Sequence, residues 1–205
     1  MRQDHLQRID KLFWDYGKSA KPLISAISKR HKDGKVPDNL LNEIRALNDH
    51  IARCYRDGVD DSYIDGELRK AEGHLRRLLY DCFKQLNIYI SDNIKRRERW
   101  SYSNRWLYRD GGNFWRQYTE WKQKAQDDVI EAKKQESIDS DVALKLFESG
   151  YCNYRNIEEL FKDNRKFLFM SSIFGIFSKA FQGIWWLVVT ILLSVAAVLI
   201  ERFVL

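Results

Sequence analysis

The chain has 205 residues, of which 31% are charged and 14% are aromatic, and its formal net charge is +6. These values exclude a disordered chain or a bare tail, because enough apolar and aromatic residues are present for one domain with a core. The positive charge suits an anionic membrane surface, RNA or a nucleotide ligand, and does not choose among them.

The three cysteines, Cys54, Cys82 and Cys152, lie far apart in the sequence. We expect them to be reduced and buried, in a protein of a reducing compartment. The charged N-terminus has no signal-peptide pattern. The sequence has no Cys/His cluster, no paired metal carboxylates and no glycine-rich phosphate loop, so we expect neither a metal nor a cofactor.

Only two prolines occur, and apolar residues recur at spacings of three and four, which predicts an all-α bundle of long antiparallel helices. Acidic residues at Asp60, Asp61 and Asp139 suit helix starts. We find no β alternation and no repeat of 20–50 residues. In chain order, helices are predicted from Asp4 to Tyr16, after Pro22, from Pro37 to about Arg56, from Asp61 toward Tyr108, from Phe114 to Ala132 and from Val142 to Phe161.

Residues 184–200 hold no charge, proline or glycine, which predicts one C-terminal transmembrane helix at the lower length limit for a span. A buried core helix is the alternative interpretation. The preceding segment is rich in phenylalanine but interrupted by polar residues, which favours an interfacial amphipathic helix. Packing on the helical domain or on a second copy, or a re-entrant hairpin, stays open. The residues predicted to contact lipid are Phe174, Phe177, Phe181, Trp185, Trp186, Ile191, Leu193 and Val198.

The chain therefore divides into a cytosolic helical domain (1–165), an interfacial helix (166–183) and a C-terminal anchor (184–205). The basic residues nearest the entrance of the predicted span are Arg165, Lys166 and Lys179. Under the positive-inside rule they stay in the cytoplasm together with the N-terminal domain.

The helix predicted to begin at Asp61 contains Arg69 and His74 in R-x4-H spacing, within GELRKAEGHLRRLLYDCFKQ, and a second match spans Arg45 to His50. This pattern resembles that of HEPN ribonucleases, which are helical bundles, and the HEPN-like helices of small membrane-anchored proteins of bacterial anti-phage defence. The resemblance implies that Arg69 stabilises anionic charge and that His74 transfers a proton at an RNA phosphate. A structural role is the alternative, because helix geometry places the two side chains well apart around the axis.

Residues 95–121 combine arginines with tryptophans, a composition that can bind phosphates and stack bases. The expected ligands are RNA, a nucleotide or lipid headgroups. Aromatic packing at a helix junction, with the arginines in solvent, is the alternative. The candidate binding residues are Arg96, Arg97, Arg99, Trp100, Arg105, Trp106, Arg109 and Arg116.

Three functions fit these features. The first is an oligomeric, single-pass effector or accessory factor of the bacterial inner membrane, which changes permeability or forms a pore in anti-phage defence. The second is a membrane-tethered HEPN ribonuclease, and the third is a scaffold that recruits a partner to the membrane. The expected partners are the lipid bilayer, further copies of the chain, and a cytosolic protein, RNA or nucleotide that acts as a trigger.

Overall fold

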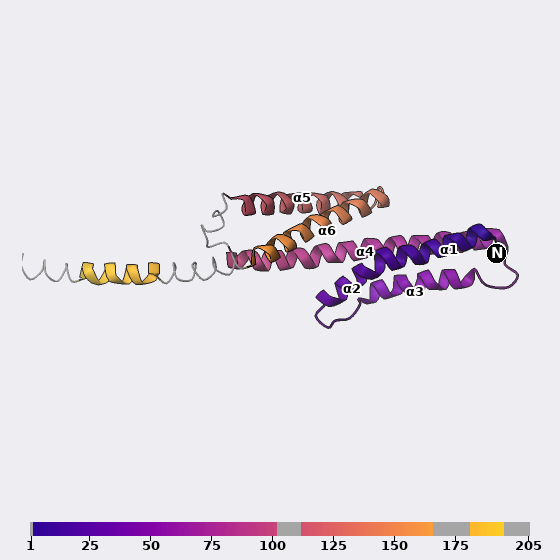
Figure 1. Ribbon diagram of the computed structural model, residues 1–205, viewed down its shortest axis with the longest axis horizontal. Coiled ribbons are helices and arrows are strands. Elements are labelled where there is room, and N and C mark those ends of the chain that lie inside the picture. The colour runs from indigo at the N-terminus through magenta and orange to yellow at the C-terminus, as the bar shows by residue number, and fades with distance from the viewer. Residues whose placement is uncertain (1, 102–111, 166–180, 195–205) are drawn as a thin grey trace, which may run out of the picture. The chain divides into compact units, whose positions relative to one another are not determined.

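The computed structural model describes residues 2–101, 112–165 and 181–194, without the side chains of 99–101. Within these ranges every regular element is helical, and no strand occurs, which confirms the all-α prediction. The elements are α1 (Gln3–Asp15), the π-helix η1 (Tyr16–Ala20), α2 (Lys21–Arg30), α3 (Asp38–Arg53), α4 (Asp61–Ser101), α5 (Asn113–Gln135) and α6 (Ser140–Asp163). Figure 1 labels the six α-helices. Residues 181–194 form a further helix.

The chain divides into two compact units. Unit 1 comprises Met1–Asn93 and Glu120–Ile157, and unit 2 comprises Ile94–Thr119 and Glu158–Leu205. The helices α4, α5 and α6 each supply residues to both units.

Carboxylates cap the helix starts as the sequence predicts. Asp60 Oδ1 accepts a hydrogen bond from the Tyr63 amide at 2.8 Å at the start of α4. Asp139 Oδ1 accepts hydrogen bonds from the amides of Asp141 and Val142, at 2.9 and 3.1 Å, at the start of α6. Each cap satisfies amide groups that have no partner within the first helical turn.

The first two predicted helices join without a gap through η1. The Lys21 amide donates to the Tyr16 carbonyl five residues earlier, which closes a π-helical turn. Pro22 follows at once in the first turn of α2. A proline fits there because its missing N–H would have no intrahelical partner in a helix that began at this point. The π-helical turn therefore allows α1 and α2 to continue as one rod although Pro22 lies in the first turn of α2.

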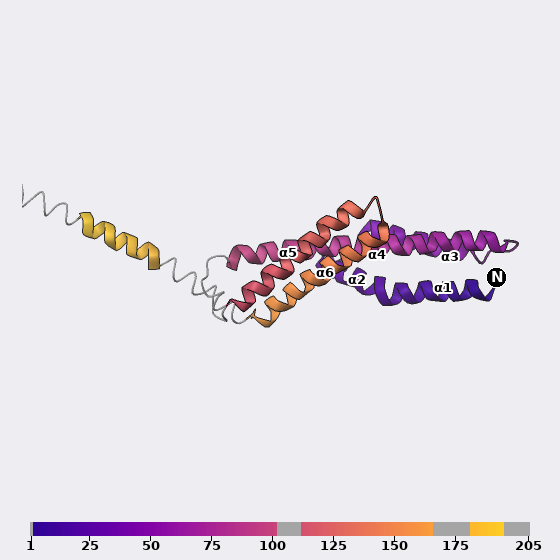
Figure 2. The ribbon, with the colours of Figure 1, turned by 90° about the horizontal axis from the view of Figure 1, so that it is seen from above.

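In unit 1, α3 runs antiparallel to α4, whereas α1 runs parallel to α4. Asn39 lies beside Asp81, and His50 lies beside Glu67, so residue numbers fall along α3 as they rise along α4. Figures 1 and 2 show both α1 and α3 beside α4. The core that these helices share consists of apolar side chains at helical spacing, among them Ile9, Leu12, Leu40, Leu47, Ile51, Ile64, Leu68, Leu75 and Leu78.

Small residues bring α5 and α6 close together. A Cβ at Gly150 would lie 3.0 Å from Val129 Cγ2 on α5, so a larger residue here requires Val129 to shift by a few tenths of an ångström. Beside it, Asp128 Oδ2 accepts hydrogen bonds from Ser149 Oγ at 2.7 Å and from Asn153 Nδ2 at 3.0 Å. These bonds give the side chains of Asp128, Ser149 and Asn153 hydrogen-bond partners at the close approach.

Unit 2 contains an aromatic cluster. Phe161 packs edge-on against Phe114 and Tyr118, with ring centroids 5.8 and 5.7 Å apart. The Tyr118 hydroxyl donates to Glu98 of α4. Phe114 and Tyr118 belong to the arginine- and aromatic-rich stretch 95–121. In the structure their rings pack at a helix junction, as in the alternative interpretation of that stretch.

Among the described helices, none has both the length and the apolar character needed to cross a membrane. The predicted span begins within the helix at 181–194, and its remainder, 195–200, lies outside the described residues. Most of the predicted interfacial helix, residues 166–180, also lies outside them.

One cysteine departs from the prediction. Cys54 and Cys82 are buried, as expected, but Cys152 is exposed on α6. All three are free thiols. The sequence around Cys152 has the aromatic neighbours of a buried position, yet the helix turns this side chain toward the edge of a cavity.

Candidate functional site: two histidine–glutamate pairs between α3 and α4

The predicted catalytic residue His74 lies at the centre of a reciprocal cluster. Its ring stacks on that of His50, with centroids 5.1 Å apart and planes at 22°. His74 Nδ1 of α4 lies 2.8 Å from Glu43 Oε2 of α3. In return, His50 Nδ1 of α3 lies 2.7 Å from Glu67 Oε2 of α4. Each helix thus supplies one glutamate and one histidine to its neighbour.

Basic residues complete both pairs. Arg77 Nε donates to Glu43 Oε2 at 3.2 Å, and Arg53 Nη1 lies 3.7 Å from Glu67 Oε2. Lys70 Nζ also donates to Glu67, at 2.6 Å. The hydrogen bonds from His50 and then Lys70 lower the pKa of Glu67 from 4.5 to about 2. Glu67 is therefore an ionised carboxylate although only 2% of the residue is exposed.

The cluster has a sequence signature, a short motif that occurs once in α3 and once in α4. Residues 43–53 read EIRALNDHIAR, and residues 67–77 read ELRKAEGHLRR. Both follow E-[I/L]-R-x4-H-[I/L]-x-R. Because a residue and its seventh successor share a helix face, each glutamate lies on the same face as its histidine. Two such faces packed antiparallel bring each histidine to the glutamate of the other helix.

The arginines of the two R-x4-H matches take no part in this cluster. Arg45 and Arg69 are exposed, and within the described residues no hydrogen bond joins Arg69 to His74. Five residues of helix place the arginine about 140° from the histidine around the axis. The structure brings the two histidines of the matches together, but leaves both arginines on other faces.

Chemically, the cluster contains carboxylate–imidazole pairs that fix the ring orientation of both histidines. The side chains of His50 and His74 are 14% and 18% exposed, so little of either ring reaches solvent. A neighbouring cavity of about 510 Å³ is lined by Arg77, Tyr80, Lys84 and Glu136, and His74 is not among its lining residues. The geometry is therefore that of a partly buried, hydrogen-bonded contact between α3 and α4.

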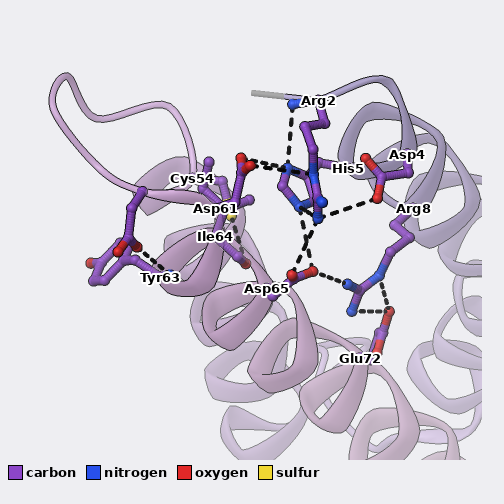
Figure 3. Close-up of polar contacts among 11 residues, drawn as sticks. Arg2, Asp4, His5, Arg8, Cys54, Asp61, Tyr63, Ile64, Asp65 and Glu72 are labelled. Carbon is purple, nitrogen blue, oxygen red and sulfur yellow. Dashed lines mark hydrogen bonds and ion pairs between the residues drawn. The ribbon is translucent and has the colours of Figure 1, made fainter.

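A second histidine cluster fixes α1 to α4, as Figure 3 shows. His5 is fully buried, and its two ring nitrogens lie 3.8 and 3.4 Å from the carboxylates of Asp61 and Asp65. Arg8 donates to Asp65 at 2.8 Å and to Glu72 at 3.0 Å. This cluster too consists of mutually satisfied charges.

The predicted arginine- and aromatic-rich surface is only partly described. Arg96 and Arg97 are exposed on α4, and the Arg97 guanidinium lies 5.5 Å from the Phe161 ring centroid. Arg116 is exposed on α5 and donates to Asn113 Oδ1 at 3.0 Å. The side chains of Arg99 and Trp100, and the whole of Arg105, Trp106 and Arg109, lie outside the described residues.

The predicted lipid-facing residues that are described all lie on the helix at 181–194. There Phe181, Trp185, Trp186, Ile191 and Leu193 are between 53% and 69% exposed. Phe174, Phe177 and Val198 lie outside the described residues.

Within the described residues, no group of three or more His, Cys, Asp or Glu side chains has an arrangement that could hold a metal ion. No family model matches the chain, and comparisons with curated proteins and with solved structures found no match. The function must therefore be argued from the chain's own chemistry.

Proposed function

We propose that the chain is a membrane-anchored helical effector, held in the bilayer by its C-terminal segment and active as an oligomer. The observation that carries the proposal is the apolar helix at 181–194. All of its large apolar side chains except Val189 are 41–69% exposed in the single chain. A contiguous apolar surface of this kind in water is unfavourable, and lipid is an environment that would cover it on every side.

The hydroxyl groups of this helix are compatible with lipid. Thr190 Oγ1 donates to the Trp186 carbonyl and Ser194 Oγ to the Thr190 carbonyl, both at 2.8 Å. Hydroxyls bonded back to their own helix leave no donor that needs water. The apolar run 184–200 would be about 26 Å long as one helix, against a hydrocarbon core of about 30 Å.

The charges around the segment support an orientation. Trp185 and Trp186 stand at its start, where aromatic residues favour the membrane interface. Arg165, Lys166 and Lys179 precede it, and only Arg202 is basic after it. The helical domain then stays on the cytoplasmic side of a bacterial inner membrane. This location agrees with the resemblance to membrane-anchored anti-phage defence proteins.

A change in permeability requires several copies, because one helix cannot enclose a pore. Reconstitution of the full chain into dye-loaded vesicles tests this step. The effector proposal expects dye release and oligomers in mild detergent. A chain that stays monomeric in lipid and releases no dye contradicts it.

A span exchange separates the effector from a scaffold. Replacing residues 184–200 by a leucine-rich span of equal length preserves anchoring. If the chain is an effector whose own segment alters the bilayer, the exchanged chain no longer releases dye. If the chain is a scaffold, the exchanged chain keeps its cellular function. The ribonuclease alternative is not favoured by the His74 geometry. Arg69 lies on another helix face, and the imidazole Nδ1 lies 2.8 Å from both Glu43 Oε2 and Arg77 Nη2, either of which can be its partner.

A further inference from the structure

Unit 1 contains a cavity where η1 and α2 face α4 and α6. Its volume is about 650 Å³, within the range of small-molecule sites. The apolar part of its lining includes Leu79 and Phe83 of α4 and Leu144 and Tyr151 of α6. Because several helices contribute, the cavity is a product of their packing rather than of one loop.

The charged residues of the lining are predominantly basic. Lys18 comes from η1, Arg30 from α2 and Arg155 from α6, and all three are exposed. Among the described residues of the lining, Glu148 is the one carboxylate residue. Three cations around a partly apolar hollow attract an anion, and arginine suits the oxygens of a phosphate.

We infer that this cavity binds a small phosphorylated organic anion with a planar ring, of the size of a nucleotide. The phosphate would lie among Lys18, Arg30 and Arg155, and the ring would stack on Tyr151. An N–H of the ring system would donate to Glu148. A fatty acid would use the cations and the apolar lining, but would offer no donor to Glu148. This site is separate from residues 95–121, and it does not depend on membrane anchoring.

Cys152 provides a built-in reporter of occupancy. It lines the cavity and is exposed, whereas Cys54 and Cys82 are 2% and 0% exposed. A thiol reagent added to the folded chain therefore modifies Cys152 first. A ligand in the cavity covers this thiol and slows its modification.

The experiment measures maleimide labelling of Cys152 in the full chain, in mild detergent, with and without ATP. If ATP binds with a dissociation constant of about 1 mM, then about 10 mM ATP slows labelling about tenfold by mass action. Tripolyphosphate supplies only the phosphates and adenosine only the nucleoside with its ring, so each should protect Cys152 less than ATP does. Equal protection by tripolyphosphate would overturn the ring-binding part, and unchanged labelling with ATP would overturn the inference.

Charge reversal tests the residues. The double variant Arg30→Glu/Arg155→Glu should lose ATP protection, while the matched variant Lys124→Glu/Lys133→Glu, exposed on α5, should keep it. Circular dichroism of both variants verifies folding, and Tyr151→Leu provides a second, uncharged probe that should weaken protection. Protection that survives in Arg30→Glu/Arg155→Glu, or laurate protecting where ATP does not, would contradict the nucleotide assignment.

Discussion

Replacing Glu67 by glutamine is the sharpest test of the histidine–glutamate cluster. The glutamine keeps the shape of the side chain but removes the charge that His50 and Lys70 contact at 2.7 and 2.6 Å. Removing one partner of a buried, hydrogen-bonded charge pair lowers stability by about 3–5 kcal/mol. The amide oxygen can still accept one hydrogen bond, so we expect a loss near the lower end, about 3 kcal/mol.

The same variant should change the pH dependence of folding. The pKa of Glu67 is about 2 in the folded chain, against 4.5 ordinarily. A lowered pKa means that this carboxylate stabilises the fold fully above pH 4.5, and that the stabilisation is lost as the pH falls from 4.5 toward 2. The difference between wild type and Glu67→Gln should therefore be largest near neutral pH and shrink on acidification.

Urea unfolding followed by far-ultraviolet circular dichroism measures both effects. With a slope of about 1–3 kcal/mol per molar urea, a loss of 3 kcal/mol lowers the midpoint by about 1–3 M. Glu43→Gln is the matched control, because its side chain is 22% exposed and its loss should be about 1 kcal/mol. Equal losses in the two variants, or a Glu67→Gln loss that is the same at pH 7 and pH 3, would refute the reasoning.

Three further changes probe the fold, each measured by urea unfolding. Asp139→Ala should lower stability by about 1 kcal/mol through loss of the α6 cap, while Ser140→Ala should not. Gly150→Ala should lower it by about 1–3 kcal/mol, because the added Cβ would lie 3.0 Å from Val129 Cγ2, and Val129→Ala in the same chain should restore part of the loss. Arg8→Ala should lose about 1–2 kcal/mol, and Arg2→Ala less, since the Arg8 side chain is 31% exposed and that of Arg2 is 52% exposed. An unchanged stability of Asp139→Ala would contradict the α6 cap, and a lack of rescue by Val129→Ala would contradict the close contact at Gly150. A larger loss in Arg2→Ala than in Arg8→Ala would contradict the greater contribution of the Arg8 contacts.

Apolar periodicity and caps were enough to predict the helices. The apolar stripe of α3 follows from residue spacing along a single helix, and the caps at Asp60 and Asp139 act within one helical turn. Both features can therefore be predicted from the local sequence. The π-helix could not be predicted this way, because it depends on how the rod continues past Pro22. The exposure of Cys152 likewise depends on which face of α6 meets α4.

The candidate site was predicted only in part. His74 was singled out through its spacing from Arg69, yet its contacts come from Glu43 and Arg77. The matching segments at 43–53 and 67–77 were a usable signal, because identical spacing on antiparallel helices implies reciprocal contacts. The cavity beside Cys152 had no such signal, since its lining comes from distant segments that meet only in the folded chain.

Alkaline carbonate extraction of membranes from cells that express the full chain tests the membrane anchor most directly. The proposal predicts that the wild-type chain stays in the membrane pellet. Val188→Arg/Leu192→Arg should release it, because residue 192 is the centre of the predicted span, where one arginine disfavours insertion by about 2.5–3.5 kcal/mol. Ile138→Arg, at an apolar residue that is 76% exposed outside the segment, should stay in the pellet. A wild-type chain recovered in the supernatant would contradict the account.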